Sequence, residues 1–74
     1  MIKLDKDIIA NNVKVLRATT GLSVRALASE LDINSMTISK LENKYHDISL
    51  ETAILLCNYF DIGLEELLFT KIKI

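Results

Sequence analysis

The stretch LSVRALASELDINSMTISKLEN, residues 22–43, decides the fold of this chain. It contains two short segments with apolar residues at helical spacing, separated by a tight turn at Asp32. These apolar residues are Leu27, Ala28 and Leu31 before the turn and Ile33, Ile38 and Leu41 after it. Because the side chain of Ala28 is small, the second helix can cross closely over the first. The stretch therefore predicts a helix-turn-helix unit over residues 23–43.

Length and composition bound the architecture. The 74 residues suffice for one small domain with a single core. Hydrophobic residues make up 50% of the chain and charged residues 26%, which is typical of a globular protein. No apolar run approaches the roughly 18 residues that a membrane span needs, and the N-terminus has no secretory pattern. We therefore expect one cytoplasmic domain over residues 1–74, without a membrane partner.

Charge is distributed unevenly along the chain, whose formal net charge is −1. Residues 1–46 carry seven lysine and arginine side chains against five acidic ones, whereas residues 47–74 carry two against five. The helix-turn-helix unit thus lies in the positive part of the chain. This distribution permits DNA binding but predicts only a modest electrostatic contribution to it.

Capping residues set the expected helix boundaries. Gly21 favours the end of a helix because glycine readily adopts the left-handed conformation. Ser23, Asn34 and Ser49 are good N-caps. Apolar residues repeat at helical spacing within each segment. The prediction is an all-α, compact domain with five helices, over about residues 7–19, 23–31, 34–43, 49–60 and 64–68.

The tail over residues 69–74 has a different pattern, because it ends in alternating isoleucine and lysine. Such alternation is typical of a half-buried strand. We expect a short β-strand here, which could pair with residues 1–4.

With the helices in this order, the chain resembles the Cro/C1-type (XRE-like) helix-turn-helix family. The similarity runs from about Val13 to Leu68, and its most specific part is a Leu-Glu-Asn followed by a Ser-Leu-Glu-Thr helix start. The matching positions are Arg17, Leu22-Ser23, Leu27-Ala28, Thr37-Ile38-Ser39, Leu41-Glu42-Asn43, Ser49-Leu50-Glu51-Thr52 and Leu64-Glu65-Glu66-Leu67. The resemblance implies a lambda-repressor-like fold, double-stranded DNA as the partner and a role in transcriptional regulation.

Four positions depart from the pattern of that family. The turn residue, usually glycine, is Asp32, and aspartate tolerates a positive φ better than most residues. Lys44 replaces the glycine common after Glu-Asn, and Ile48 replaces the proline common before the fourth helix. Val24 stands where a glutamine often holds a DNA phosphate. One backbone anchor is therefore missing, and Arg25 beside it could compensate.

The third expected helix carries the candidates for reading DNA bases. On a helical wheel, Met36 and Lys40 lie opposite the apolar arc, with serine and threonine at the flanks. The base-reading candidates are Ser35, Met36, Thr37, Ser39 and Lys40. A lysine can donate to guanine O6 and N7 or to a phosphate, hydroxyls donate and accept, and methionine can pack on a thymine methyl. An ordinary solvated helix face is the alternative, and an outward methionine disfavours it.

Two further sets of residues have other expected roles. The candidates for contact with the DNA sugar-phosphate backbone lie at the start of the second expected helix and after the third, and are Ser23, Arg25, Asn43, Lys44 and Tyr45. In the resembling family, the positions of Arg17 and Glu42 form a partly buried ion pair between the first and third helices. The resemblance thus implies a structural role for these two residues and not a DNA contact.

Catalytic and cofactor motifs are not visible in the sequence. The single cysteine can form neither an internal disulfide nor a CxxC metal site. Glu65 and Glu66 are adjacent and point in different directions, so they make a poor acid–base pair. We expect no enzymatic activity, no metal, no cofactor and no small-molecule ligand.

The C-terminal third contains more apolar residues than a core of this size needs. On the fourth expected helix, Leu55 lies nearly opposite the core-facing residues. The candidates for a dimer interface are Ile54, Leu55, Tyr59, Phe69, Ile72 and Ile74. A homodimer is expected because one short helix makes too few base contacts to select a unique site. We place the dimerisation region at about residues 50–74.

Two functions remain open at this point. The first is sequence-specific transcriptional regulation, by a repressor or small controller that binds a palindromic operator as a homodimer. The second is a protein-interaction module, of the antirepressor or antitoxin kind, on the same scaffold. The polar helix face with Lys40 and Lys44 favours the first function, whereas the acidic balance and Val24 favour the second.

Overall fold

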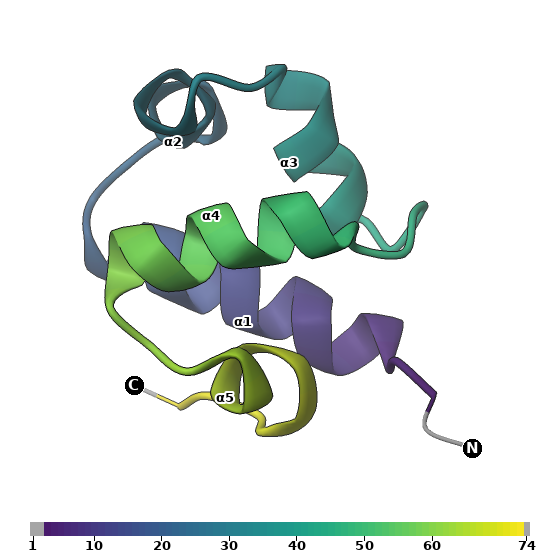
Figure 1. Cartoon of the computed structure of the whole chain (residues 1–74). Helices are drawn as coiled ribbons and strands as arrows, with labels where there is room; N and C mark the ends of the chain where they lie inside the picture. Colours follow the sequence, from purple (N-terminus) through teal and green to yellow (C-terminus); the bar gives the residue numbers. More distant parts are fainter. Residues whose placement is uncertain (1–2, 74) are drawn as a thin grey trace.

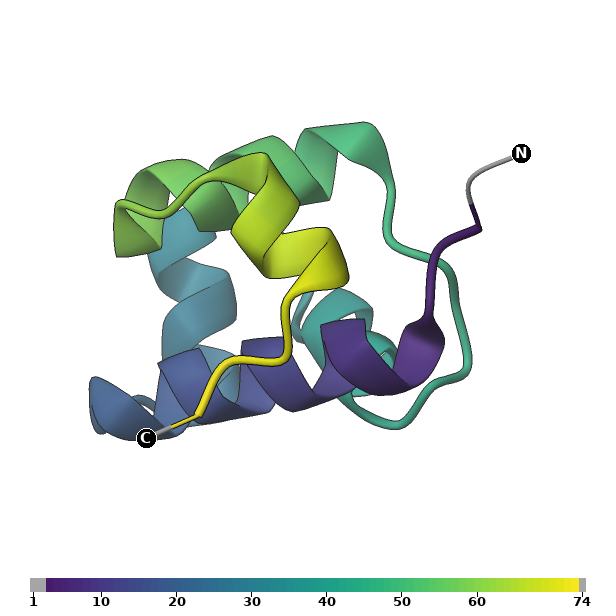
Figure 2. The ribbon, with the colours of Figure 1, turned by 90° about the horizontal axis from the view of Figure 1, so that it is seen from below.

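The computed structural model describes residues 3–73, and within them it contains five α-helices and no strand. The helices are α1 (Lys6–Thr19), α2 (Val24–Leu31), α3 (Ser35–Glu42), α4 (Leu50–Phe60) and α5 (Leu64–Phe69). In Figure 1, α2 and α3 lie above α1 and α4, and α5 lies below them. Figure 2, seen from below, shows α1 and α4 at opposite faces with the other helices between them. The expected all-α, five-helix fold is confirmed.

Side-chain caps explain where the first four helices begin. The side chains of Ser23, Asn34 and Ser49 each accept a hydrogen bond from a backbone N–H two or three residues later. Asp5, which was not among the expected caps, does the same for α1. Each cap satisfies a backbone donor that has no partner within its helix. The predicted starts of α2, α3 and α4 therefore agree with the structure.

Four helices end on a residue in the left-handed conformation. Gly21, Asp32, Lys44 and Asp61 have φ angles of 73°, 56°, 64° and 55°. The next N–H in each case donates to a carbonyl five residues earlier, in the pairs Leu22–Arg17, Ile33–Ala28, Tyr45–Lys40 and Ile62–Cys57. This is the Schellman ending, which stops a helix and turns the chain sharply. Short connections of this kind let five helices share one small core.

The core collects apolar side chains from all five helices. Its buried members are Ile9, Val13, Leu27, Ala28, Leu31, Ile38, Leu41, Ile48, Ala53, Leu56 and Leu67. The apolar residues that define the helix-turn-helix unit, apart from the partly buried Ile33, thus belong to the same core as residues of α1, α4 and α5. Within residues 3–73, no helix combines the length and the hydropathy that crossing a membrane would need.

Two asparagines of α1 hold the chain that follows α5. The side chain of Asn12 is fully buried, and its Nδ2 lies 2.8 Å from the carbonyl oxygens of Leu67 and Thr70 and 3.3 Å from that of Glu66. Its Oδ1 accepts the N–H of Ile72 at 2.8 Å. The neighbouring Asn11 donates to the carbonyl of Ile72 at 3.1 Å. Figure 2 shows this tail running across α1.

The prediction of a strand over residues 69–74 is therefore wrong for the part that the structure describes. Phe69 ends α5, and residues 70–73 belong to neither a helix nor a strand. The asparagine side chains supply the donor and acceptor groups that a second strand would have supplied, so the tail needs no β partner. Met1, Ile2 and Ile74, which the predicted pairing also involved, lie outside the described residues.

Asn12→Asp should lower the free energy of unfolding by about 3 kcal/mol or more at neutral pH. The change keeps the shape but replaces the buried donor with a carboxylate oxygen that faces three carbonyl oxygens. Urea unfolding followed by circular dichroism measures the loss. Asn58→Asp, an exposed change on α4, is the matched control and should shift the free energy by less than about 0.5 kcal/mol. Equal losses in the two variants would contradict the role of Asn12.

Candidate nucleic-acid interface

The packing of α2 against α3 determines which face of α3 is exposed at the candidate interface. Helices α2 and α3 pack against each other, and Ala28 of α2 and Ile38 of α3 are both buried in the shared core, at 2% and 0% exposure. Asp32 turns the chain between them in the left-handed conformation, as its position in the sequence predicts. Ile33, next to it, packs partly against the core. The unit is therefore a rigid pair of helices in which one face of α3 is left uncovered.

Helix α3 has an inward and an outward face. Ile38, Leu41 and Glu42 point inward and are buried. Met36 is the most exposed of the base-reading candidates, with 58% of its surface accessible. The other four candidates, Ser35, Thr37, Ser39 and Lys40, are partly exposed. The structure thus puts all five where a macromolecule lying along α3 could contact them.

The polar groups on this face differ in whether contacts within the protein already occupy them. Among the described residues, Lys40 has no ion-pair partner, so its ammonium group is available to an external acceptor. Asn43 is less free, because its Nδ2 donates to the carbonyl of Ser39 at 2.7 Å and its backbone N–H donates to the same carbonyl at 3.0 Å. The Nδ2 of Asn43 also lies 3.4 Å from the Ser39 hydroxyl oxygen. Lys40 is therefore the strongest single donor that this face offers.

The candidates for DNA-backbone contact lie at the start of α2 and directly after α3. Ser23 and Arg25, at the start of α2, are exposed, and Ser23 keeps its hydroxyl hydrogen free because its oxygen accepts the N–H of Ala26. Tyr45, in the loop after α3, is 74% exposed. Lys44 is exposed too, but its Nζ is paired with Asp7 of α1 at 2.9 Å. Val24 packs partly against the core, which gives a structural reason for an apolar residue at that position.

Arg17 and Glu42 tie α3 to α1 from the buried side. Arg17 Nε lies 2.6 Å from Glu42 Oε2, and Nη2 lies 2.9 Å from Oε1, so the contact is bidentate. The Arg17 Nη1 also donates to the carbonyl of Leu22 at 3.0 Å. Hydrogen bonding to Glu42 raises the pKa of Arg17 above its ordinary value, burial opposes this, and the charge of Glu42 adds to it. The pair is mostly buried and leaves neither side chain free for DNA.

Two features of the structure were missed by reasoning from the sequence, one of them outside the candidate interface. Asn12 follows Ile9 by three positions, so its place on the inward face of α1 could have been read from the helical spacing. The pairing of Lys44 with Asp7 joins residues that are far apart in the sequence and follow no periodic pattern. The Asn12 position thus had a sequence signal, and the ion pair had none.

Comparisons with known proteins agree with this geometry. The helix-turn-helix family model HTH_3 matches residues 13–67. Among solved structures, the crystal structure of the hypothetical transcription factor NHTF from Neisseria is similar, with a TM-score of 0.77 and 22% sequence identity over 93% of this chain and 85% of that one. No match was found among curated proteins. At 22% identity, the structural likeness speaks for the fold alone.

Arg17→Ala and Glu42→Ala should each lower the free energy of unfolding by about 3 kcal/mol, because each leaves a buried charge without its partner. The double variant should lose clearly less than the two single losses added together. Chemical denaturation of the four proteins gives this coupling energy. The exposed pair Lys6–Asp47, with 3.9 Å between Nζ and Oδ1, is the matched control, and its coupling should stay below about 0.5 kcal/mol. Additive losses for Arg17 and Glu42 would contradict an interaction between these two side chains.

Proposed function

The chain belongs to the Cro/C1-type (XRE-like) helix-turn-helix family of DNA-binding transcriptional regulators, and on this basis we propose that it is a repressor that binds a palindromic operator as a homodimer. Its place of action would be the cytoplasm, where such an operator is accessible. The observation that carries the proposal is the uncovered face of α3, which presents Met36 and an ammonium group, that of Lys40, with no ion-pair partner within residues 3–73. Binding of α3 in the major groove would block access of other proteins to the operator.

Contacts to bases and contacts to phosphates would come from different parts of the unit. We assign base reading to the N-terminal and outward residues of α3, with Lys40 donating to guanine and Met36 packing against a thymine methyl. Phosphate contacts would come from Ser23 and Arg25 at the start of α2 and from Tyr45 after the end of α3. The modest positive charge of residues 1–46 suits a protein whose binding depends on such specific contacts more than on overall charge.

The homodimer would form through the C-terminal helices, α4 and α5. Their exposed apolar residues include Ile54 at 47% accessible surface and Phe69 at 42%. Leu64, at 40%, lies with Phe69 in an apolar hollow that also includes Leu68. To read two half-sites, such a dimer would have to place its two α3 helices about 34 Å apart, the length of one DNA turn.

The other dimer candidates from the sequence differ in what they can contribute. Leu55 is half-buried against the core and does not lie opposite it. Tyr59, also on α4, donates to Glu30 of α2 at 3.1 Å. Ile72 is half-buried, and its backbone is held by Asn11 and Asn12. Ile74 lies outside the described residues. We therefore centre the proposed interface on Ile54, Leu64 and Phe69.

Selection from a pool of random DNA duplexes tests the proposed function. The expected result is enrichment of one sequence with two-fold symmetry and half-sites about one helical turn apart. Enrichment of an asymmetric site would contradict the homodimer but not the DNA-binding role. No enrichment at all would contradict operator binding and favour the alternative, a protein-interaction module on the same scaffold.

Lys40→Ala should weaken binding to the selected duplex. If Lys40 reads a guanine, the loss should be about 1–3 kcal/mol and confined to one base position of the half-site. If Lys40 holds a phosphate, all sequences should weaken alike and the slope of log K against log salt should fall by about one. Lys73→Ala, which removes the same charge from the C-terminal tail, is the control. Binding as tight and as selective as in the parent would contradict the role of Lys40 in DNA binding.

Phe69→Ser combined with Ile54→Ser should give a folded monomer, because the two changes remove exposed apolar surface and no core side chain. Binding to the full palindrome should weaken by at least about ten-fold, since the second half-site contact is no longer linked to the first. Analytical ultracentrifugation and titration on full-site and half-site duplexes measure both effects. Leu4→Ser, another exposed apolar change, should leave the dimer intact. An unchanged dimer in the double variant would place the interface elsewhere.

A further inference from the structure

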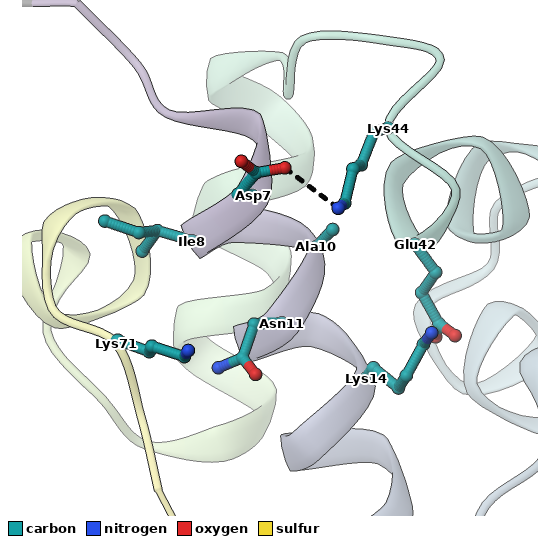
Figure 3. Close-up of a pocket in the computed structure, with 8 residues that line it drawn as sticks. All are labelled: Asp7, Ile8, Ala10, Asn11, Lys14, Glu42, Lys44 and Lys71. Atoms are coloured by element: carbon teal, nitrogen blue, oxygen red, sulfur yellow. Dashed lines mark ion pairs between the residues drawn. The ribbon is translucent and has the colours of Figure 1, made fainter.

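The loop between α3 and α4 is joined to the first turn of α1 by two exposed ion pairs. The Nζ of Lys44 lies 2.9 Å from Oδ1 of Asp7, as Figure 3 shows. The Nζ of Lys6 lies 3.9 Å from Oδ1 of Asp47. The Asp7–Lys44 contact is short enough for a charge-assisted hydrogen bond, whereas the second contact is at the limit of an ion pair. Of the two, only the Asp7 contact restrains a candidate for DNA binding.

The backbone conformation fixes the direction in which the side chain of Lys44 leaves the chain. Lys44 occupies the left-handed position that ends α3, with φ of 64°. Its N–H donates to the carbonyl of Leu41 at 3.2 Å, and the N–H of Tyr45 donates to that of Lys40 at 2.9 Å. Because this ending sets the direction of the Lys44 Cβ relative to α3, the ammonium group can reach only a limited region. In the structure that region contains the carboxylate of Asp7.

The other charged groups around this contact have partners or are cations. Beneath it lies a pocket between α1 and the end of α3, which is also lined by Lys14, Lys71 and Glu42 (Figure 3). The carboxylate of Glu42 is occupied by Arg17 on its buried side. Lys14 and Lys71 add positive charge, which does not neutralise Lys44. Asp7 is therefore the anion that holds the Lys44 ammonium group.

We propose that Asp7 sets the DNA affinity of the protein by competing with a DNA phosphate for Lys44. The inference rests on the proposed function, because it assumes that the loop after α3 meets the DNA backbone. A phosphate oxygen and the Asp7 carboxylate are both anions that the same ammonium group can bind. To bind DNA through Lys44, the protein must weaken the contact with Asp7 or bring a phosphate close to an unneutralised carboxylate. Removing the Asp7 charge therefore frees Lys44 for DNA.

The test is Asp7→Asn, which keeps the size of the side chain and removes its charge. Binding to the selected duplex should tighten about two- to five-fold per bound copy, the change that corresponds to the usual strength of an exposed ion pair. Asp47→Asn removes an equal charge from the loop that carries Lys44 but leaves Lys44 paired with Asp7, so it should tighten binding by clearly less. In a Lys44→Ala background, Asp7→Asn should give no gain beyond that of Asp47→Asn. Circular dichroism checks that all variants are folded.

Three results would overturn the inference. Asp7→Asn could bind no tighter than the parent, Asp47→Asn could match its gain, or the gain could persist without Lys44, which would indicate a general charge effect. Each of these can occur while the parent binds its site and Lys40→Ala weakens that binding, so the inference can fail while the proposed function stands. A parent that binds no duplex would overturn both, and that result is recognised before any Asp7 variant is compared.

Discussion

The candidate interface depends on the bidentate contact between Arg17 and Glu42. Glu42 is the last residue of α3, and Arg17 lies in the last turn of α1. The same guanidinium also holds the carbonyl of Leu22, which lies between α1 and α2. One side chain thus fixes the end of α3 and the entry into α2 relative to α1. Because a charge-assisted bidentate contact tolerates little rotation, the outward face of α3 has one orientation relative to the rest of the domain.

Helix α1 also holds the C-terminal part of the molecule, through Asn12. This buried amide binds the carbonyl groups at the end of α5 and the N–H of Ile72, so each of its polar atoms has a partner. Arg17 contacts α3 and Leu22, which precedes α2, whereas Asn12 contacts the end of α5 and the tail that follows it. A single helix therefore connects the face that we assign to DNA with the helices that we assign to dimerisation. The spacing of the two α3 helices in a dimer would then be set by the fixed positions of α3 and α5 relative to α1.

Most of the fold could be predicted from the sequence, because local signals decide most of it. Ser23, Asn34 and Ser49 mark helix starts, and Gly21 and Asp32 mark helix ends, as the structure has them. The tail could not be predicted, because its partners are side chains of α1 and not another strand. The Lys44–Asp7 contact depends on a loop conformation that periodicity does not specify. Such errors fall where tertiary contacts override the local pattern.

The most direct test of the central claim, that α3 held by α1 is the DNA-reading element, is an amide-resolved NMR titration of the protein with its selected duplex. The largest shift changes should occur at residues 34–45, with a second group at 23–25 near the start of α2. Residues 50–69 should change little beyond what dimer formation alone produces in the absence of DNA. Changes concentrated in residues 50–69, with residues 34–45 unaffected at saturating duplex, would contradict the claim.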